Sequence, residues 1–419
     1  METTLVNKTA TDEQTKPQQQ PEDLVALAQR RLYGNYRPAP IVITRGKGCE
    51  VFDASGKRWL DLAAGVAVCS VGHAHPELVK AISEQAGKVM HVSNYFLNEP
   101  NIRLADELCR RSGMDRAFFC NSGAEANEAL LKLARHHFYG MGDKARTRVI
   151  AFHNAFHGRT LGALSMTGTP KYREGFGELG AVTHVPYGDL DAVKAALGPD
   201  VAAVIVEPLQ GEGGVLPAPA GFLRGLREAC DAAGALLLVD EVQTGIGRLG
   251  RLFGHDGSGA KPDALALAKG LGGGFPIGAM LTSAKVAGAL PPGTHGSTFG
   301  GNPLACAASL AVLRILDSEK LVEGARIKGE ALARMLGELV KQLPAVCEGH
   351  RGDGLLRGLV LKQGFVARDV LPRVQDAGVL LTAAGDRVLR FSPPLVVTEA
   401  ELEEGVRALA GVLGHLAAA

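Results

Sequence analysis

Residues 236–245 read LLLVDEVQTG, in which an apolar run leads directly into two adjacent acids, Asp240 and Glu241. Four consecutive apolar residues are typical of a strand that is covered on both faces. A carboxylate at the end of such a strand is energetically costly unless a cation meets it. A strand-end aspartate considered alone is more often a helix N-cap or part of a buried ion pair, so the rest of the chain has to identify the cation.

Apolar runs of this kind recur between about residues 115 and 285, where they alternate with helical patterns. They are AFFC (117–120), RVIAF (148–152), AVTHVP (181–186), AAVIVEP (202–208), ALLLVD (235–240), DALALAK (263–269) and GAMLTS (278–283). This alternation predicts an α/β fold with a mostly parallel central sheet. Ligands bind at the carboxyl ends of the strands in such sheets, and Glu207, Asp240 and Lys269 all fall there.

The remainder of the chain predicts a smaller α+β domain. After residue 302, helical patterns at 303–316, 321–343 and 398–416 alternate with strands at 355–361, 379–382 and 388–391. Near the N-terminus, a helix at 22–34 precedes a hairpin that turns at 53–56, and helices follow at 76–85 and 101–112. We therefore expect a disordered tail (1–21), an N-terminal segment that joins the small domain (22–75), a large domain (76–310) and a C-terminal small domain (311–419).

Composition narrows the class of protein. The 419 residues are 46% hydrophobic and 21% charged with a net charge of +1, which favours a globular protein without a nucleic-acid surface. No apolar run approaches the roughly 18 residues of a membrane helix, and the N-terminal stretch lacks the pattern of a secretory or transit peptide. The seven cysteines are scattered and form no CxxC motif, which favours reduced thiols in the cytoplasm.

Two alternative motifs can be weighed from the residues. GIGRLG (245–250) fits the dinucleotide pattern GxGxxG, but the Gly-rich segment behind it has no helical period to aim at a pyrophosphate. The histidines of HAH (73–75) and at positions 136 and 137 have no acidic or cysteine partners at ligand spacing, so we expect no metal site.

Lys269 and the stretch 121–124 indicate which cation meets Asp240. Lys269 closes an apolar strand and precedes four glycines within five residues, and a buried lysine suits Schiff-base chemistry. The turn NSGA (121–124) joins a strand to a helix, where free N–H groups and the helix dipole can hold a phosphate, although Ser122 with Glu125 also fits a capping box. A phosphate cup, a Schiff-base lysine and an unpaired acid together indicate pyridoxal phosphate, whose protonated ring nitrogen is the cation for Asp240.

Six stretches of the sequence resemble the class III (ornithine-type) pyridoxal-phosphate aminotransferases in order and spacing. They are NSGAEANEAL (121–130), FHGRT (156–160), VEPLQGEGG (206–214), LLLVDEVQTGIGR (236–248), LALAKGLGGGFPIGA (265–279) and HGSTFGGNPLACAA (295–308). The resemblance extends from about residue 33 to the C-terminus. It implies fold type I, the aspartate-aminotransferase-like fold, with a large pyridoxal-phosphate-binding domain and a homodimer that shares its active sites.

The resemblance also implies roles for individual residues. Lys269 would hold the cofactor as a Schiff base and move the proton, and Asp240 would bind the ring nitrogen. The cofactor-binding positions as a set are Ser122, Gly123, Ala124, Phe156, Asp240, Val242, Gln243, Lys269 and, from the neighbouring subunit, Thr298. The substrate-binding positions are Tyr36, Arg159, Glu207, Ser297 and Arg390, and Glu207 would neutralise Arg390 whenever the ω-amine substrate is bound.

Within the family, NYRPAP (35–40) and GVAVCSVGHAHPELV (65–79) look most like acetylornithine aminotransferases, although Cys69 replaces the usual Asn. This implies transfer of the δ-amino group of N-acetyl-L-ornithine to 2-oxoglutarate by a ping-pong mechanism, as in arginine biosynthesis. The alternatives are another ω-aminotransferase (for succinylornithine, ornithine or 4-aminobutyrate), a glutamate-1-semialdehyde aminomutase and, outside enzymes, a nucleotide-binding protein.

Overall fold

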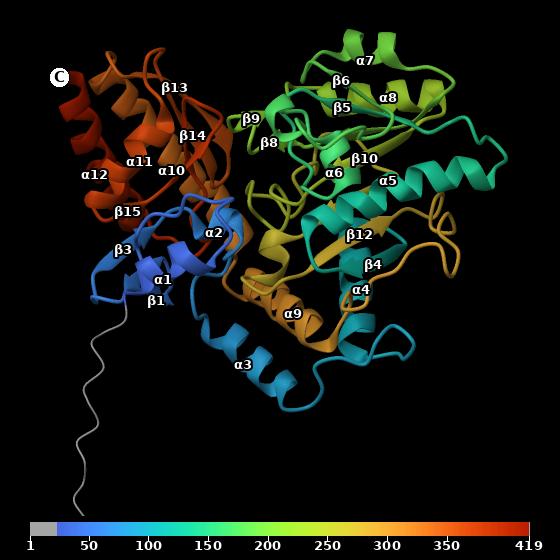
Figure 1. The fold of residues 1–419 in the computed structure, drawn as a ribbon, viewed down its shortest axis with the longest axis horizontal. Helices are drawn as coiled ribbons and strands as arrows, with labels where there is room; N and C mark the ends of the chain where they lie inside the picture. The colour runs from blue at the N-terminus through green and yellow to red at the C-terminus, as the bar shows by residue number, and fades with distance from the viewer. Residues whose placement is uncertain (1–22, 419) are drawn as a thin grey trace, which may run out of the picture.

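The computed structural model describes residues 23–418, and the tail expected over residues 1–21 lies outside them. A seven-stranded sheet forms the centre of the larger part of the molecule (Figure 1). Its strands in spatial order are β4 (Arg116–Cys120), β12 (Gly278–Thr282), β11 (Ala264–Leu267), β10 (Leu236–Asp240), β7 (Val201–Val206), β5 (Arg148–Phe152) and β6 (Val182–Val185). Neighbouring strands pair in parallel except at β12, which is antiparallel to both β11 and β4. All seven apolar runs of the sequence are strands of this sheet, which confirms the predicted α/β fold.

Helices cover both faces of the sheet, as the continuous burial of its strands requires. Leu236 and Leu238 of β10 pack in one hydrophobic cluster with helix α5 (Gly123–Gly140), whereas Leu237 and Val239 pack in another with α8 (Phe222–Ala233). The other helical segments of this part are α3 (Pro76–Ala86), α4 (Glu99–Ser112), α6 (Leu161–Met166), the 3-10 turn η1 (Pro170–Tyr172), α7 (Leu190–Ala196), the 3-10 turn η2 (Lys269–Gly272) and α9 (Pro303–Ser318).

Two smaller four-stranded sheets lie beside the large one, together with the C-terminal helices (Figure 1). One contains β1 (Ile43–Lys47), β2 (Glu50–Asp53), β3 (Arg58–Asp61) and β15 (Val379–Leu380); the other contains β13 (Cys347–Asp353), β14 (Leu356–Leu361), β17 (Val388–Phe391) and β16 (Thr382–Ala384). The remaining elements are α1 (Leu24–Arg31), α2 (Ala64–Ala67), the pair β8 (Leu209–Gln210) and β9 (Leu216–Pro217), α10 (Leu321–Gln342), α11 (Ala367–Asp376) and α12 (Glu399–Ala418). Because β15 pairs in parallel with β3, segments more than 300 residues apart share one sheet.

The short α2 segment has an unusual backbone conformation. Ala64, Gly65, Val66 and Ala67 all have positive φ angles, between 48° and 66°, so the turn is left-handed. This conformation costs about 1–2 kcal/mol for each residue that carries a Cβ, so neighbouring groups have to hold it in place. The buried carboxylate of Asp61 does so by accepting hydrogen bonds from the N–H groups of residues 63 and 64.

Within residues 23–418, no helix combines the length and apolar character needed to cross a membrane. The same part of the chain contains no group of three or more histidine, cysteine or acidic side chains that could hold a metal ion.

Candidate active site

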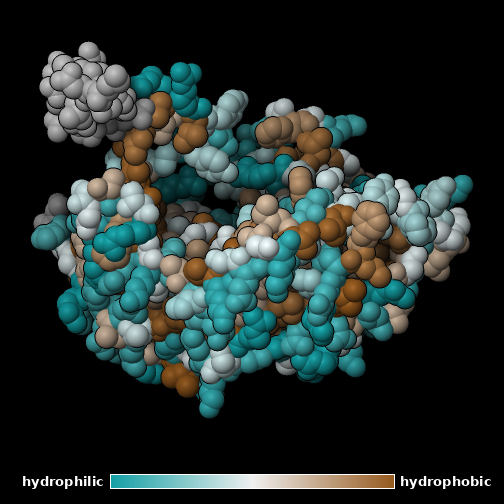
Figure 2. Space-filling model, turned by 90° about the horizontal axis from the view of Figure 1, so that it is seen from below, coloured by the Kyte–Doolittle hydropathy of each residue, from teal (hydrophilic) through white to brown (hydrophobic). Residues whose placement is uncertain are grey.

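A cavity of about 390 Å³ opens at the carboxyl ends of the central parallel strands. Figure 2 shows that the face seen from below is deeply hollowed, with hydrophobic residues along the rim. Residues from six segments line the cavity: Val68, Asn121, Ser122, Gly123, Ala124, Asn127, Phe156, His157, Gly158, Arg159, Glu207, Glu212, Asp240, Val242, Gln243, Ala268, Lys269, Gly274, Phe275, Pro276 and Ile277. Ten of the predicted site residues are in this set. The parallel strands bring them together, since each strand ends at the same edge of the sheet.

Asp240, the last residue of β10, lies at the inner wall of the cavity and is only 3% exposed. One carboxylate oxygen accepts hydrogen bonds from His157 Nδ1 and from Asn127 Nδ2, both at 2.7 Å, and the other accepts the N–H of Val242 at 2.9 Å. Burial lowers the pKa of His157, but the hydrogen bond and the charge of Asp240 outweigh burial and raise it overall. His157 is therefore a partner that the protein itself supplies to Asp240, and the carboxylate favours the protonated form of its imidazole.

Glu241, the second acid of the opening stretch, points to the opposite side of the sheet, as the alternation of a strand requires. Its carboxylate accepts hydrogen bonds from His255 Nδ1 at 2.7 Å, from the Thr244 hydroxyl at 2.5 Å and from two backbone N–H groups. Burial raises the pKa of Glu241, but the hydrogen bond from His255 lowers it overall. Glu241 thus stabilises the part of the structure beneath the cavity through these hydrogen bonds.

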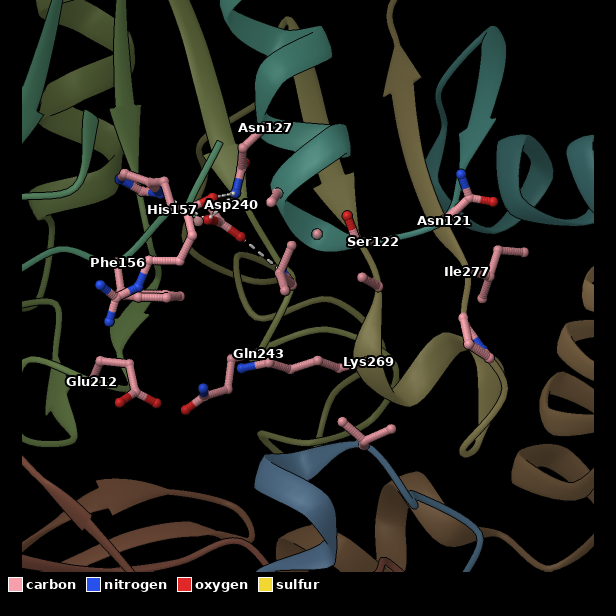
Figure 3. A pocket seen from close by; sticks show the side chains of 18 of the residues that line it. Asn121, Ser122, Asn127, Phe156, His157, Glu212, Asp240, Gln243, Lys269 and Ile277 are labelled. Carbon is pink, nitrogen blue, oxygen red and sulfur yellow. Dashed lines mark hydrogen bonds and ion pairs between the residues drawn. The ribbon is translucent and has the colours of Figure 1, made fainter. Parts of the chain in front are cut away.

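Lys269 follows β11 and begins the η2 turn, with its own φ in the left-handed region at 45°. Its side chain extends across the cavity toward Gln243 (Figure 3). Burial lowers the pKa of Lys269 to about 8, and Glu212 acts in the opposite direction. A substantial fraction of this amine is therefore neutral, and hence nucleophilic, near neutral pH.

The N-terminus of α5 points its free N–H groups at the same cavity. The Ser122 hydroxyl accepts the N–H of Glu125 and so caps the helix, while the Glu125 carboxylate reaches back to the N–H of Asn121, one residue before the N-cap, in a variant of the capping box. Among residues 23–418, no acceptor is hydrogen-bonded to the N–H groups of Gly123 and Ala124. The sequence left helix capping and anion binding as alternatives for this turn. In the structure the start of α5 provides both a side-chain cap and free N–H groups that can hold an anion.

Gly123 also permits the close packing of Val242 in this cup. A Cβ added to Gly123 would lie 2.6 Å from Val242 Cγ1, which is closer than real side chains approach. Phe156 and Val242 both line the cavity, and in Figure 3 the ring of Phe156 lies near Asp240 and Gln243. A flat ring can be held between such an aromatic and a branched aliphatic side chain.

Arg390 of β17 lies next to the cavity and is 2% exposed, but its ion-pair partner differs from the predicted one. Arg390 forms an ion pair with Glu212 and donates to Gln243 Oε1 at 3.3 Å and to Thr382 Oγ1 at 3.0 Å. The predicted pairing of Arg390 with Glu207 is therefore wrong. The charge of Arg390 also keeps the pKa of Glu212 low, although burial alone would raise it.

Glu207 is buried at the end of β7, where its carboxylate accepts the N–H of Phe156 at 3.1 Å. Burial raises the pKa of Glu207 to about 8. A carboxyl with this pKa is mostly protonated at neutral pH, so Glu207 would be a poor partner for an arginine even if it were closer.

Of the remaining predicted substrate and cofactor residues, Arg159 lines the cavity, whereas Ser297, Thr298 and Tyr36 lie outside its lining. Arg159 stacks on Tyr172, with its guanidinium carbon 3.9 Å from the ring centroid. Ser297 accepts a hydrogen bond from Asn121, which does line the cavity. Thr298 and Tyr36 are exposed, and Tyr36 is 78% exposed.

Three further cavity residues were missed in the sequence: Asn127, His157 and Glu212. His157 and Glu212 lie within the quoted stretches FHGRT and VEPLQGEGG, so a signal existed for both. Asn127 also lies within a quoted stretch, NSGAEANEAL, but the packing of α5 against β10 is what brings its amide to Asp240, 113 positions along the chain.

The lining fits pyridoxal phosphate on four independent counts. Asp240 presents a carboxylate for a protonated ring nitrogen, and Lys269 presents a partly neutral amine. Free N–H groups at the start of α5 suit a phosphate, and Phe156 and Val242 give the cavity an aromatic and a branched aliphatic side chain that suit a ring. The donors and acceptors match the cofactor's phosphate, ring nitrogen and aldehyde in kind.

The family model described as aminotransferase class-III matches residues 33–413. The chain belongs to the class III aminotransferases. It is 51% identical to the acetylornithine aminotransferase of Myxococcus xanthus over 382 residues, which cover 91% of this chain and 95% of that protein. It is 48% identical to the acetylornithine aminotransferase of Pseudomonas putida, covering 89% and 92% of the two chains.

Solved structures of aminotransferases have the same fold. The ornithine aminotransferase from Toxoplasma gondii ME49 superimposes with a TM-score of 0.90 at 36% identity, over 94% of each chain. The N-acetylornithine aminotransferase from Stenotrophomonas maltophilia K279a gives 0.82 at 39% identity, over 94% of this chain and 99% of that one. This class III aminotransferase is accordingly a pyridoxal-phosphate enzyme of the aspartate-aminotransferase-like fold, as the sequence predicted.

Proposed function

We propose that this aminotransferase transfers the δ-amino group of N-acetyl-L-ornithine to 2-oxoglutarate by a ping-pong mechanism, as a step of arginine biosynthesis. The observation that carries the proposal is the 51% identity to a relative named acetylornithine aminotransferase over nearly the whole of both chains. The presence of an arginine with a releasable acid partner beside the cavity supports it, because a ping-pong enzyme has to accept two unlike substrates in turn.

The cofactor roles follow from the contacts of each residue. Lys269 holds the cofactor and, once displaced by substrate, removes and returns the substrate proton through its Nζ atom. Asp240, oriented by His157 and Asn127, keeps the ring nitrogen protonated. Bound pyridoxal phosphate supplies an electron sink for the electron pair left on the substrate carbon. We assign the ring hydroxyl to Gln243 and the phosphate to Ser122, Gly123 and Ala124, all of which line the cavity.

The substrate roles centre on two arginines. Arg159 lies at the cavity wall, where its guanidinium can bind the α-carboxylate of the ω-amine substrate. Glu212 forms the ion pair with Arg390 during the half-reaction of the ω-amine substrate. In the half-reaction of 2-oxoglutarate, the α-carboxylate of that substrate takes the place of Glu212. Tyr36 and Ser297 remain proposed substrate contacts, as does Glu207 without its role as partner of Arg390.

A homodimer with shared active sites is part of this proposal. Large apolar side chains are exposed on neighbouring segments, namely Val89, Met90, Tyr95, Phe96, Leu97, Ile102 and Phe299. The two segments are held together, since Asn94 donates hydrogen bonds to the carbonyls of residues 297 and 300. An exposed apolar surface of this kind supports burial against a second copy, which would carry Thr298 to the neighbouring active site. We propose the cytoplasm as the location, on the basis of the free cysteines.

A panel of amine donors tests the substrate. The purified enzyme is supplied with 2-oxoglutarate and one donor at a time, and glutamate is measured. We expect the highest kcat/KM with N-acetylornithine, followed by succinylornithine, with free ornithine and 4-aminobutyrate far behind. A preference for either of the last two would overturn the proposal, and isomerisation without any glutamate would point to an aminomutase.

A further inference from the structure

The guanidinium of Arg159 is held in a different way from that of Arg390. Arg390 is buried, forms an ion pair with Glu212 and donates to the Thr382 hydroxyl. Arg159 is exposed at the cavity wall, and among residues 23–418 its side chain forms no ion pair and no hydrogen bond. A long side chain that is free to rotate loses entropy when it binds a carboxylate. A contact that orients Arg159 beforehand would lower that cost.

Two aromatic rings provide such a contact. The central carbon of the Arg159 guanidinium lies 3.9 Å from the centroid of the Tyr172 ring and 5.4 Å from that of Phe156. Both distances fall within about 6 Å, the range in which the face of an aromatic ring attracts a cation. The two rings are nearly perpendicular, at 88° with centroids 6.1 Å apart, which is a favourable edge-to-face arrangement. The three side chains thus form one cluster at the wall of the catalytic cavity.

The backbone that carries this cluster is fixed on both sides. Gly158, the neighbour of Arg159, has a φ of 135° and lies so close to helix α5 that an added Cβ would be 2.7 Å from Ala124 Cβ. Tyr172 is the last residue of the η1 turn, in which its N–H donates to the carbonyl of Thr169 at 3.1 Å. The side chain of Arg159 is therefore what remains to be oriented, and Tyr172 offers it a half-buried ring at a fixed position.

An aromatic ring orients a guanidinium without neutralising it. A carboxylate partner would occupy the N–H donors of Arg159 and would have to leave before a substrate carboxylate could bind, as proposed for Glu212 at Arg390. A ring carries no formal charge and no strong acceptor, so the N–H donors of Arg159 stay available for a bidentate ion pair. Tyr172 lines a neighbouring cavity and not the catalytic one, so we expect it to act on the substrate through Arg159.

We propose that Tyr172 is a positioning residue for the substrate carboxylate: its ring holds the Arg159 guanidinium ready to bind and thereby sets the preference for amine donors that carry an α-carboxylate. The proposal rests on the role of Arg159 in the proposed function. It goes beyond that role, because it assigns the orientation of Arg159 to a residue of another segment, outside the catalytic cavity. An exposed cation–π contact changes an affinity by about two- to fivefold, which is the size of the expected effect.

The test compares Tyr172→Leu, which removes the ring, with Tyr172→Phe, which keeps it. The holoenzyme is mixed with N-acetylornithine or with N-acetylputrescine, the same amine without the carboxylate. The first half-reaction is followed in single turnovers through the absorbance of the cofactor. Tyr172→Leu should lower the efficiency with N-acetylornithine by about two- to fivefold, through a weaker apparent affinity and with the limiting rate constant unchanged. With N-acetylputrescine, Tyr172→Leu should have no effect.

Tyr172→Phe should retain the efficiency with both donors, since among residues 23–418 the Tyr172 hydroxyl forms no hydrogen bond. Equal losses with the two donors in Tyr172→Leu would show a merely structural role and overturn the proposal. A loss in Tyr172→Phe as large as that in Tyr172→Leu would overturn it as well, because the ring would then not be the group that matters.

A double variant gives a second, independent test. In an Arg159→Gln background the ring has no cation to hold, so Tyr172→Leu should cause no further loss with N-acetylornithine. A further loss of the same size would refute the proposal. Lys171→Gln is the matched control, because Lys171 belongs to the same turn and its Nζ lies 5.8 Å from the same ring but does not line the catalytic cavity. A loss in Lys171→Gln equal to that in Tyr172→Leu would assign the effect to the turn and not to the ring.

Failure of the proposed function is distinguishable from failure of this inference. The first would appear in the unmodified enzyme, as a preference for another ω-amine such as ornithine. The same variants are then compared with ornithine and with putrescine, which again differ only in the carboxylate. The second would appear only in the variants, as an unchanged ratio of the efficiencies with the two donors.

Discussion

Replacing Glu212 with Gln tests the electrostatic relation that separates the two half-reactions. Arg390 and Glu212 form an ion pair in which the arginine side chain is 3% exposed and the glutamate side chain 27% exposed. Gln is nearly the same size and retains an oxygen acceptor, so the substitution removes the charge and leaves the packing in place. Arg390 then has no carboxylate partner at position 212. It can therefore bind the carboxylate of an incoming substrate without first breaking an ion pair.

The magnitude follows from the burial of this pair. A hydrogen bond to a charged group contributes about 1.5–3 kcal/mol, and each 1.4 kcal/mol corresponds to about tenfold in affinity. We therefore expect Glu212→Gln to improve kcat/KM for glutamate in its half-reaction by about 10- to 100-fold. The half-reaction with N-acetylornithine should not gain, because its carboxylate is proposed to bind Arg159. Each half-reaction can be followed separately, in single turnovers, through the absorbance of the cofactor.

Glu207→Gln is the matched control for this prediction. Glu207 also lies at the cavity, but it accepts the N–H of Phe156 and does not contact Arg390. An amide oxygen can accept the same N–H, and the carboxyl is already mostly neutral below pH 8. The ratio of the two half-reaction efficiencies should stay within about twofold of the unmodified enzyme. A shift of that ratio in Glu207→Gln, with none in Glu212→Gln, would refute the assignment.

The remaining predictions concern the cofactor site. Lys269→Ala should abolish transamination and leave the circular dichroism spectrum unchanged; residual turnover at the normal rate would rule out its role. In the cofactor-free protein, pyridoxal phosphate uptake should accelerate as the pH rises through about 8 and level off above it, because burial lowers the pKa of Lys269 and its neutral amine is the reactive form. Stopped-flow absorbance measures this uptake, and a rate still climbing toward the ordinary value of 10.5 would contradict the shift. Asp240→Asn should lower kcat by roughly 100- to 1000-fold, since a preorganised charge beside the reacting system is lost. Near-normal kcat there would count against the pairing with the ring nitrogen. Gly123→Ala should lower the free energy of unfolding, measured in urea, by about 1–3 kcal/mol, because the added Cβ would press on Val242. An unchanged urea midpoint would mean that Gly123 and Val242 are packed less closely than the structure indicates.

The sequence predicted elements with a strong hydrophobic pattern and missed those without one. Every strand of the large sheet was predicted, because buried parallel strands are apolar throughout. Strand β13 was missed, since its sequence CEGHRGD contains a single apolar residue and its side chains are mostly half-exposed. Helix α11 was missed as well, and it contains an internal proline, Pro372, that a pattern search treats as a helix end.

The predicted domain boundaries remain a proposal. The pairing of β15 with β3 supports the assignment of residues 22–75 to the small domain, because the strand 379–380 completes their sheet. Helix α9 (Pro303–Ser318) packs against both α3 and α4, which favours a boundary after residue 318 and not within this helix at residue 310. Limited proteolysis of the native protein would show which connections are accessible.

Glu207 and Glu212 show why the sequence identified the right segment and the wrong acid. The residues are five positions apart in VEPLQGEGG, and either could face an arginine from a distant strand. Glu207 directly follows the buried strand β7, so its carboxyl remains at the sheet edge, where burial raises its pKa. Glu212 follows β8, and the short pairing of β8 with β9 carries it across to β17 and Arg390. A two-residue strand is too short to show a hydrophobic period, so the β8–β9 pairing could not be predicted from the sequence.

The two adjacent acids of the opening stretch are each compensated by a histidine, on opposite sides of the sheet. Asp240 faces His157 and Glu241 faces His255, with both hydrogen bonds at 2.7 Å. The sequence argument assigned the cation for Asp240 to the cofactor, because a Schiff-base lysine and a phosphate cup accompany this acid. The fold provides His157 from the segment after β5, 83 positions away, and the charge of Asp240 raises the pKa of this histidine. Asp240 is thus already paired and oriented before any cofactor arrives, so cofactor binding does not have to offset the burial of an isolated carboxylate.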